Sequence, residues 1–218
     1  MKLSITEENY LKAIYKLSEK SNQSVSTNYI SREMKTSAAS VTDMLKRLAD
    51  KKLLKYAKYK GASLTVLGSK ISTTLIRKHR LWEVFLVDKL HFKWDEVHEI
   101  AEQLEHINSD PLIDRLDSFL NFPKFDPHGD PIPSADGKFT LRNQQLLTEI
   151  QLNKPAVVVG VKEHSVFFLR HLDDLRINLG QELEIIEKFD YDDSLKIKVG
   201  EDIQMISAKV ARNIYVKT

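Results

Sequence analysis

The chain has 218 residues, of which 42% are hydrophobic and 29% are charged, with 7 glycines and 6 prolines. This composition is ordinary for a globular protein and excludes collagen-like and disordered chains. The sequence contains no cysteine, which excludes disulfides, thiolate nucleophiles and cysteine-based metal sites, so any metal must be held by histidine, carboxylate, amide or water. No run approaches the roughly 18 apolar residues of a membrane span, and the N-terminus lacks the apolar stretch of a signal peptide. We therefore expect a cytoplasmic protein with no membrane partner.

Charge is distributed unevenly along the chain. Residues 1–80 contain 17 Lys and Arg against 6 Asp and Glu, a net charge of +11, whereas the remaining 138 residues have a net charge of −9. All seven histidines lie at or after position 79. A basic segment followed by an acidic, histidine-bearing one favours an anion-binding module joined to a cation-binding module. The alternative is chance clustering of solvated charges.

Apolar spacing in the first part of the chain is typical of a helix-turn-helix. It predicts a helix that begins near Thr6 and ends near the polar run 18–26, followed by helices over 28–34 and 38–51. Two strand-like runs, 53–56 and 62–66, flank a basic turn at 57–61. A hairpin in this place indicates the winged type of helix-turn-helix, which we assign to residues 1–72.

The rest of the chain divides into a helical part and a part made of short strands. Helices are predicted over 67–90, 95–107 and 111–122. Four prolines within eleven residues, from Pro123 to Pro133, indicate a linker. A short helical segment is expected over 141–150, and strands over 156–161, 166–169, 183–187, 194–199 and 203–206. The expected fold class is mainly α with a small β-barrel, with a helical domain over 73–141 and the barrel over 142–218.

Two groups of residues have the spacing of metal ligands. On a helical wheel the side chains of His98, Glu102, Glu105 and His106 share one arc, opposite the apolar residues of the same segment. Upstream, His79 and Glu83 are four residues apart and face the same side of a helix. A solvated acidic face is the alternative interpretation, but two such groups in a chain without cysteine indicate a metal-binding module.

An enzymatic function has little support in the sequence. His98-Glu99 begins like the His-Glu-x-x-His motif of zinc proteases, but position 102 is glutamate, so the second histidine is missing. The glycine patterns of nucleotide-binding loops and of serine hydrolases are also absent. We expect no catalytic activity.

Several motifs together resemble the diphtheria toxin repressor family of metal-dependent transcriptional regulators, including its manganese transport regulators. They are the segments 8–15, 37–42, 77–83, 97–106 and 127–133. The resemblance covers nearly the whole chain and is most specific in the block from His79 to Glu83 and the block from His98 to His106. It implies a winged helix-turn-helix, a helical dimerisation and metal-binding domain, and a C-terminal SH3-like (FeoA-like) domain.

The resemblance also implies two metal sites in each monomer. The primary site of the family corresponds to Asn9, Glu102, Glu105 and His106. The ancillary site corresponds to His79, Glu83 and His98, with Asp126, His128 and Glu163 as further candidate ligands. Glu102 stands where iron-responsive members use cysteine, so the site is harder and better suited to Mn²⁺, with Fe²⁺ as the alternative. Asn9 stands where manganese members usually have Asp and iron members Met, so one negative charge is lost.

The function implied is metal-dependent repression of metal-uptake genes. Mn²⁺ would link the first helix to residues 96–107, so that a homodimer places two recognition helices in successive major grooves of a palindromic operator. The expected DNA-binding residues are Thr27, Ser37, Ala39, Ser40, Thr42, Asp43, Lys46, Arg47, Lys58, Tyr59 and Lys60. The alternatives are an iron-responsive repressor of the same family, a metal-storage or chaperone protein, and a winged-helix repressor that binds DNA without metal.

Overall fold

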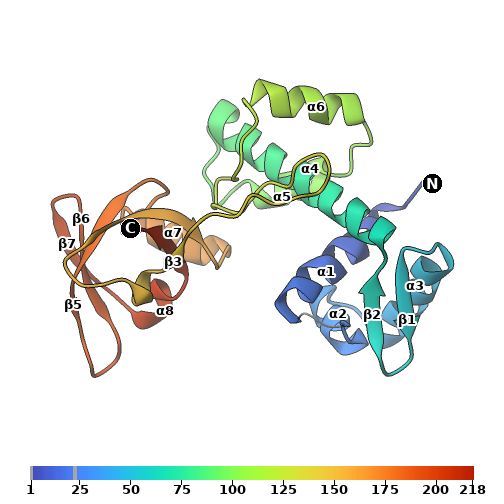
Figure 1. The fold of residues 1–218 in the computed structure, drawn as a ribbon, viewed down its shortest axis with the longest axis horizontal. Coiled ribbons are helices and arrows are strands. Elements are labelled where there is room, and N and C mark those ends of the chain that lie inside the picture. The colour runs from blue at the N-terminus through green and yellow to red at the C-terminus, as the bar shows by residue number, and fades with distance from the viewer. Residues whose placement is uncertain (1, 22–23) are drawn as a thin grey trace. The chain divides into compact units, whose positions relative to one another are not determined.

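The computed structural model of the protein describes residues 2–21 and 24–218. The helices are α1 (Ile5–Ser21), α2 (Thr27–Glu33), α3 (Ala38–Asp50), α4 (Val66–Leu90), α5 (His98–Leu104), α6 (Asp110–Phe119), α7 (Val166–Asp174) and α8 (Ala208–Ala211), with a 3-10 turn at Leu147–Glu149 (Figure 1). The strands are β1 (Leu54–Ala57), β2 (Gly61–Leu64), β3 (Gln145–Leu146), β4 (Pro155–Val161), β5 (Glu182–Lys188), β6 (Leu195–Val199), β7 (Asp202–Ile206) and β8 (Ile214–Lys217). These elements form two compact units. The first contains residues up to 79, 104–109 and 133–139, and the second contains 80–103, 110–132 and 140–218.

The first unit contains the predicted helix-turn-helix. Leu11 and Ile14 of α1 join Ile30 of α2 and Leu45 and Leu48 of α3 in one buried core. Serine hydroxyls cap the two later helices, because the side chain before α2 accepts a hydrogen bond from the Tyr29 amide and the side chain before α3 accepts one from the Ser40 amide. Residues 22 and 23, within the polar run where we expect the first helix to end, lie outside the described residues.

A two-stranded hairpin follows α3 and forms the wing. Strands β1 and β2 pair antiparallel from Leu54 opposite Leu64 to Ala57 opposite Gly61. Gly61 has a φ of +84°, and a Cβ there would lie 2.5 Å from the carbonyl oxygen of Val25. Glycine is therefore required at this point, where the wing approaches the backbone before α2.

A capping box fixes the start of α1. The Ser4 amide donates to Glu7 Oε2 at 3.0 Å, and the Glu7 amide donates to Ser4 Oγ at 3.3 Å. The second carboxylate oxygen of Glu7 lies 2.6 Å from Lys51 Nζ, directly after α3. One buried side chain therefore caps α1 and also ties it to the C-terminal end of α3.

The second unit contains a six-stranded antiparallel sheet together with α5, α6 and the C-terminal part of α4. The strand order is β3-β8-β4-β5-β6-β7. Leu169 and Leu172 of α7 pack into the core of this sheet, and so does Trp94 from the segment after α4. The described strands form an open sheet with β3 and β7 at its edges, so a closed SH3-like barrel is not confirmed.

Three predicted elements differ from the structure, and one strand was missed. The helix expected over 95–107 is reduced to His98–Leu104, because turns stand on both sides of it. The strand expected over 166–169 is the first turn of α7, since a short apolar run does not distinguish a strand from a buried helix. The helix expected over 141–150 is β3 followed by a 3-10 turn, and β8 was not predicted.

The structure also bears on membrane association. None of the described helices is both long enough and apolar enough to cross a bilayer.

Glu7 yields a prediction about stability and pH. The Lys51 ammonium and the Ser4 amide hold the pKa of the Glu7 carboxyl below its ordinary value. Such a group stabilises the fold above its unfolded pKa of about 4.3, and this stabilisation is lost as pH falls through the lower folded pKa. We expect Glu7→Gln to lower the free energy of unfolding by about 1–2 kcal/mol at pH 7. Urea titrations should show the difference shrinking below about pH 4.

Glu19→Gln is the matched control, because Glu19 is an exposed carboxylate on the same helix. It should leave the free energy of unfolding within about 0.5 kcal/mol of wild type. A Glu7→Gln deficit that stayed constant from pH 7 to pH 3 would contradict the ionic role of Glu7.

Candidate metal centre and nucleic-acid interface

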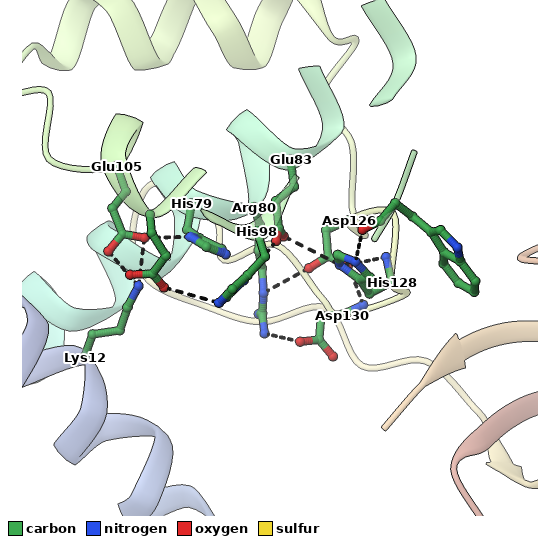
Figure 2. Close-up of polar contacts among 11 residues, drawn as sticks. Lys12, His79, Arg80, Glu83, His98, Glu105, Asp126, His128 and Asp130 are labelled. Atoms are coloured by element: carbon green, nitrogen blue, oxygen red, sulfur yellow. Dashed lines mark hydrogen bonds and ion pairs between the residues drawn. The ribbon is translucent and has the colours of Figure 1, made fainter. Parts of the chain in front are cut away.

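Glu105 is the centre of a buried group of charged side chains in the first unit. Its carboxylate has no exposed surface, and its two oxygens accept hydrogen bonds from Lys12 Nζ at 2.6 and 2.8 Å. Oε2 also lies 2.6 Å from His79 Nδ1 (Figure 2). Lys12 belongs to α1, His79 to α4 and Glu105 to the turn after α5. The carboxylate therefore connects three segments that are far apart in the sequence.

His106 and Asn9 extend this group. His106 Nδ1 lies 2.6 Å from Glu8 Oε2, and its Nε2 lies 3.7 Å from the carboxylate of Glu105. Asn9 follows Glu8 on α1, and its side-chain oxygen is buried without a hydrogen-bond partner among the residues that the structure describes. A buried oxygen of this kind is costly unless it is satisfied, and coordinating a cation would satisfy it.

A second group lies in the second unit and consists of Glu83, Asp126 and His128. All three are buried, and one ligand atom of each lies within 4.8 Å of the others. His128 Nδ1 is 3.8 Å from Glu83 Oε2 and 4.0 Å from Asp126 Oδ1. His98 Nδ1 lies 3.5 Å from the other oxygen of Glu83 (Figure 2). This group combines two carboxylates with imidazoles, which are ligands for a hard to borderline divalent cation.

Backbone groups and an arginine fix the orientation of these ligands. Asp126 Oδ1 accepts hydrogen bonds from the amides of His128 and Asp130, while Arg80 Nε lies 3.3 Å from Asp126 Oδ2. His128 Nε2 donates to the carbonyl oxygen of Trp94 at 2.8 Å. Since that carbonyl can only accept, Nε2 carries a proton and Nδ1 is directed to the carboxylates.

The electrostatics of this second group favour a positive charge at its centre. Burial raises the pKa of Asp126 to about 7, and the nearby carboxylates of Glu83 and Asp130 add to the increase. Burial lowers the pKa of His128, but the carboxylates of Glu83 and Asp126 outweigh it and raise the pKa to about 9. The group thus retains a proton near neutral pH. A divalent cation would replace that proton, because metal ligands bind in their deprotonated form.

The predicted ligands also make contacts that the sequence does not indicate. His79 Nδ1 lies 2.6 Å from Glu105 Oε2, and His79 and Glu83 lie one turn apart on α4, as predicted. Glu102 lies 3.7 Å from His98 on the same helix. Their assignment as metal ligands stays a prediction.

The candidate ligand from the C-terminal part of the chain, Glu163, has other contacts. Glu163 accepts a hydrogen bond from the Ser165 amide and belongs to none of the ligand groups found among the described residues. The ring of His164, which was not predicted, lies 5.0 Å from the ring of His128.

Sequence reasoning missed four residues around these groups. Glu8 and Lys12 are four apart on α1, so the helical spacing that selected His79 and Glu83 could also have selected them. Arg80 lies 3.3 Å from Asp126 and 2.7 Å from Asp130, although both are about 50 residues further along the chain. No local pattern in the sequence predicts a contact between residues so far apart in the chain.

The predicted DNA-binding residues lie on α2, α3 and the wing. Ser37, Ala39, Ser40, Asp43, Lys46, Arg47, Lys58, Tyr59 and Lys60 are exposed, while Thr27 and Thr42 are half-buried. A hollow of about 610 Å³ separates the helices from the wing, and it is lined by Thr27, Thr42, Lys46, Lys58 and Tyr59, and also by Ser26, Asn28, Ala38, Tyr56 and Gly61. The side chain of Tyr59 at the tip of the wing is 93% exposed. Their contacts with DNA stay a prediction.

A winged helix-turn-helix with an exposed basic face, in one chain with buried groups of oxygen and imidazole ligands, defines a DNA-binding regulator of the metal-responsive class. Three family models match the chain: the iron-dependent repressor N-terminal DNA-binding domain over residues 2–62, the iron-dependent repressor metal-binding and dimerisation domain over 65–134, and the FeoA domain over 145–218. The iron-dependent repressor IdeR of Mycobacterium leprae is 34% identical over 161 residues, which cover 71% of this chain and 70% of IdeR.

Solved structures give the same result. A manganese-dependent transcriptional repressor in complex with manganese has a TM-score of 0.82 at 30% identity, covering 96% of this chain and 98% of its own. The manganese regulator SloR has a TM-score of 0.72 at 34% identity, covering 97% of both chains. The chain belongs to the iron-dependent repressor family of metal-dependent transcriptional regulators. The predicted family is confirmed, and IdeR and the manganese-dependent relative are transcriptional repressors.

The basic face yields a prediction about DNA binding. Each lysine that contacts a phosphate releases about one counterion, so its loss should reduce the slope of log K against log salt concentration by about one. We expect this reduction for Lys46→Ala and for Lys60→Ala, measured by fluorescence anisotropy on a duplex selected from a random-sequence pool. Lys188→Ala, in β5 of the second unit, is the control. An unchanged slope in the first two variants would mean that these lysines do not contact phosphate.

Proposed function

We propose that this chain is a manganese-responsive repressor that binds palindromic operator DNA as a homodimer when it is loaded with metal, and so represses metal-uptake genes in the cytoplasm. The observation that supports this most is the buried group of Glu83, Asp126 and His128, which offers two carboxylates and an imidazole without sulfur. Mn²⁺ accepts such ligands. The solved relatives include a manganese-dependent repressor and a manganese regulator.

The residues present fit a divalent cation. We assign one site to Asn9, Glu102, Glu105 and His106, where the unpartnered oxygen of Asn9 is a ready ligand. A second site takes His79, Glu83 and His98 together with Asp126 and His128. The same ligands also accept Fe²⁺, and IdeR is an iron-dependent repressor, so iron is the second candidate. When bound, the cation supplies the positive charge that these buried carboxylates require.

The link to DNA runs through α1. Glu8, Asn9 and Lys12 lie on the side of this helix that meets the turn after α5. The opposite side packs Leu11 and Ile14 against the helix-turn-helix core. A metal that held α1 through Asn9 and Glu105 would favour the DNA-competent state, because an effector that binds one state better shifts the population toward it. In a dimer, two recognition helices then reach half-sites about 34 Å apart.

Operator binding titrated with Mn²⁺, Fe²⁺ and Zn²⁺ tests this function. We expect DNA binding to require metal, and Glu83→Gln or Asp126→Asn to raise the Mn²⁺ concentration for half-maximal binding by about 10–100-fold. Glu163→Gln is the matched control, because this carboxylate accepts a hydrogen bond from the Ser165 amide and lies outside the ligand groups.

Each rival function has its own outcome in the same assay. DNA binding at full strength in the presence of a chelator would show a repressor that needs no metal. Metal binding that leaves DNA affinity unchanged would support a storage or chaperone protein. Full activation by Fe²⁺ at concentrations where Mn²⁺ is inactive would establish the iron-responsive alternative.

A further inference from the structure

Lys12 holds a position that the proposed function leaves unexplained. Its side chain is 7% exposed, and its ammonium lies 2.6 and 2.8 Å from the two oxygens of Glu105, whose side chain is fully buried. The contact joins residues 93 positions apart, from α1 to the turn after α5. A buried lysine in contact with both oxygens of a predicted metal ligand already supplies a positive charge at that carboxylate.

The two cations compete for one carboxylate. A divalent ion coordinated by Glu105 would lie about 2–2.6 Å from a carboxylate oxygen. The ammonium in its present position would then be a close like charge in a site screened from water, where repulsion is strong. His79 Nδ1 already lies 2.6 Å from Oε2, which reduces the room left on that oxygen. Glu105 therefore binds Lys12 or a metal, but not both in this arrangement.

We propose that Lys12 is a tethered competitor of the divalent cation. In the metal-free protein the ammonium neutralises Glu105 and holds α1 in place, and a metal coordinates Glu105 only when the ammonium leaves. This inference rests on the proposed function, since it takes Glu105 as a metal ligand. Lys12 thereby raises the metal concentration at which the site with Asn9 and His106 fills.

The test compares Mn²⁺ binding in wild type, Lys12→Met and Lys12→Arg by isothermal titration, together with melting temperatures in chelator and in excess Mn²⁺. Methionine keeps much of the length of lysine without its charge. We expect Lys12→Met to bind Mn²⁺ at one site about tenfold or more tightly than wild type, with the other site unchanged. It should melt at a lower temperature without metal, because Glu105 stays buried and unbalanced, and gain more than wild type from Mn²⁺. Lys12→Arg keeps the positive charge, so it should keep the wild-type Mn²⁺ affinity at that site.

Lys51→Met is the matched control. It removes a lysine from the Lys51–Glu7 ion pair, which has the same 2.6 Å contact but lies away from the ligand residues. We expect it to lower stability and leave both Mn²⁺ affinities at the wild-type values. If Lys12→Met does not fold, Lys12→Gln, which keeps a hydrogen-bond donor but no charge, is titrated in the same way.

The outcomes separate this inference from the proposed function. Wild-type affinities at both sites in a folded Lys12→Met protein would overturn the competitor role and leave Lys12 a structural ion pair. Tighter binding in Lys51→Met equal to that in Lys12→Met would also overturn it. A wild-type protein that binds no Mn²⁺, with Glu83→Gln indistinguishable from it, would instead refute the proposed function.

Discussion

A carboxylate removed from water requires a positively charged partner. The buried carboxylate of Glu105 is in this position, at the point where α1, α4 and the turn after α5 meet. The desolvation cost of a buried ion amounts to several kcal/mol, and only close contacts with opposite charge and good hydrogen bonds offset it. Lys12 provides the opposite charge at 2.6 Å, and His79 adds a second contact at 2.6 Å. Removing Lys12 would leave the carboxylate without its cation, so the place of α1 in the first unit depends on this balance.

The second unit meets the same requirement by a different means. Asp126 is balanced by Arg80 and by backbone amides, while Glu83 faces the imidazole of His128. The proton on that imidazole is exchangeable, because His128 changes its charge without moving its ring. A lysine ammonium leaves Glu105 only by movement of the whole side chain. The two groups therefore differ in what a metal, bound as proposed, would have to displace: a proton in the second unit and a side chain in the first.

The parts of the fold that depend on local sequence could be predicted, and those that depend on distant contacts could not. The helix-turn-helix follows from apolar spacing, serine caps and a glycine turn, all within a few residues of one another. The first turn of α7 was misassigned because the run from Val166 to Leu169 is equally apolar on every side, and only packing on the sheet decides its conformation. β8 is a strand because it pairs with β4, more than 50 residues earlier.

The candidate sites divide in the same way. Residue types and helical spacing selected Glu105, His106 and Glu83, since ligands four apart share a face whatever the fold. The sequence could not show that His79 contacts Glu105, or that Lys12 neutralises it, because these contacts close loops of 26 and 93 residues. A helical wheel reports only which side chains share a face. It does not show which charged side chain from another part of the chain contacts that face.

α1 is the element in which the electrostatic and the DNA-binding parts of the first unit meet. Lys12 and Leu11 are adjacent in sequence, yet one contacts Glu105 and the other lies with Leu45 of the recognition helix in a core without exposed surface. Close-packed interiors deform little, so a helix fixed on one face moves as a body and carries its other face with it. If a metal replaces Lys12 on Glu105 as proposed, the exchange would therefore act on the recognition helix through packing alone, and no contact between metal and DNA would be needed.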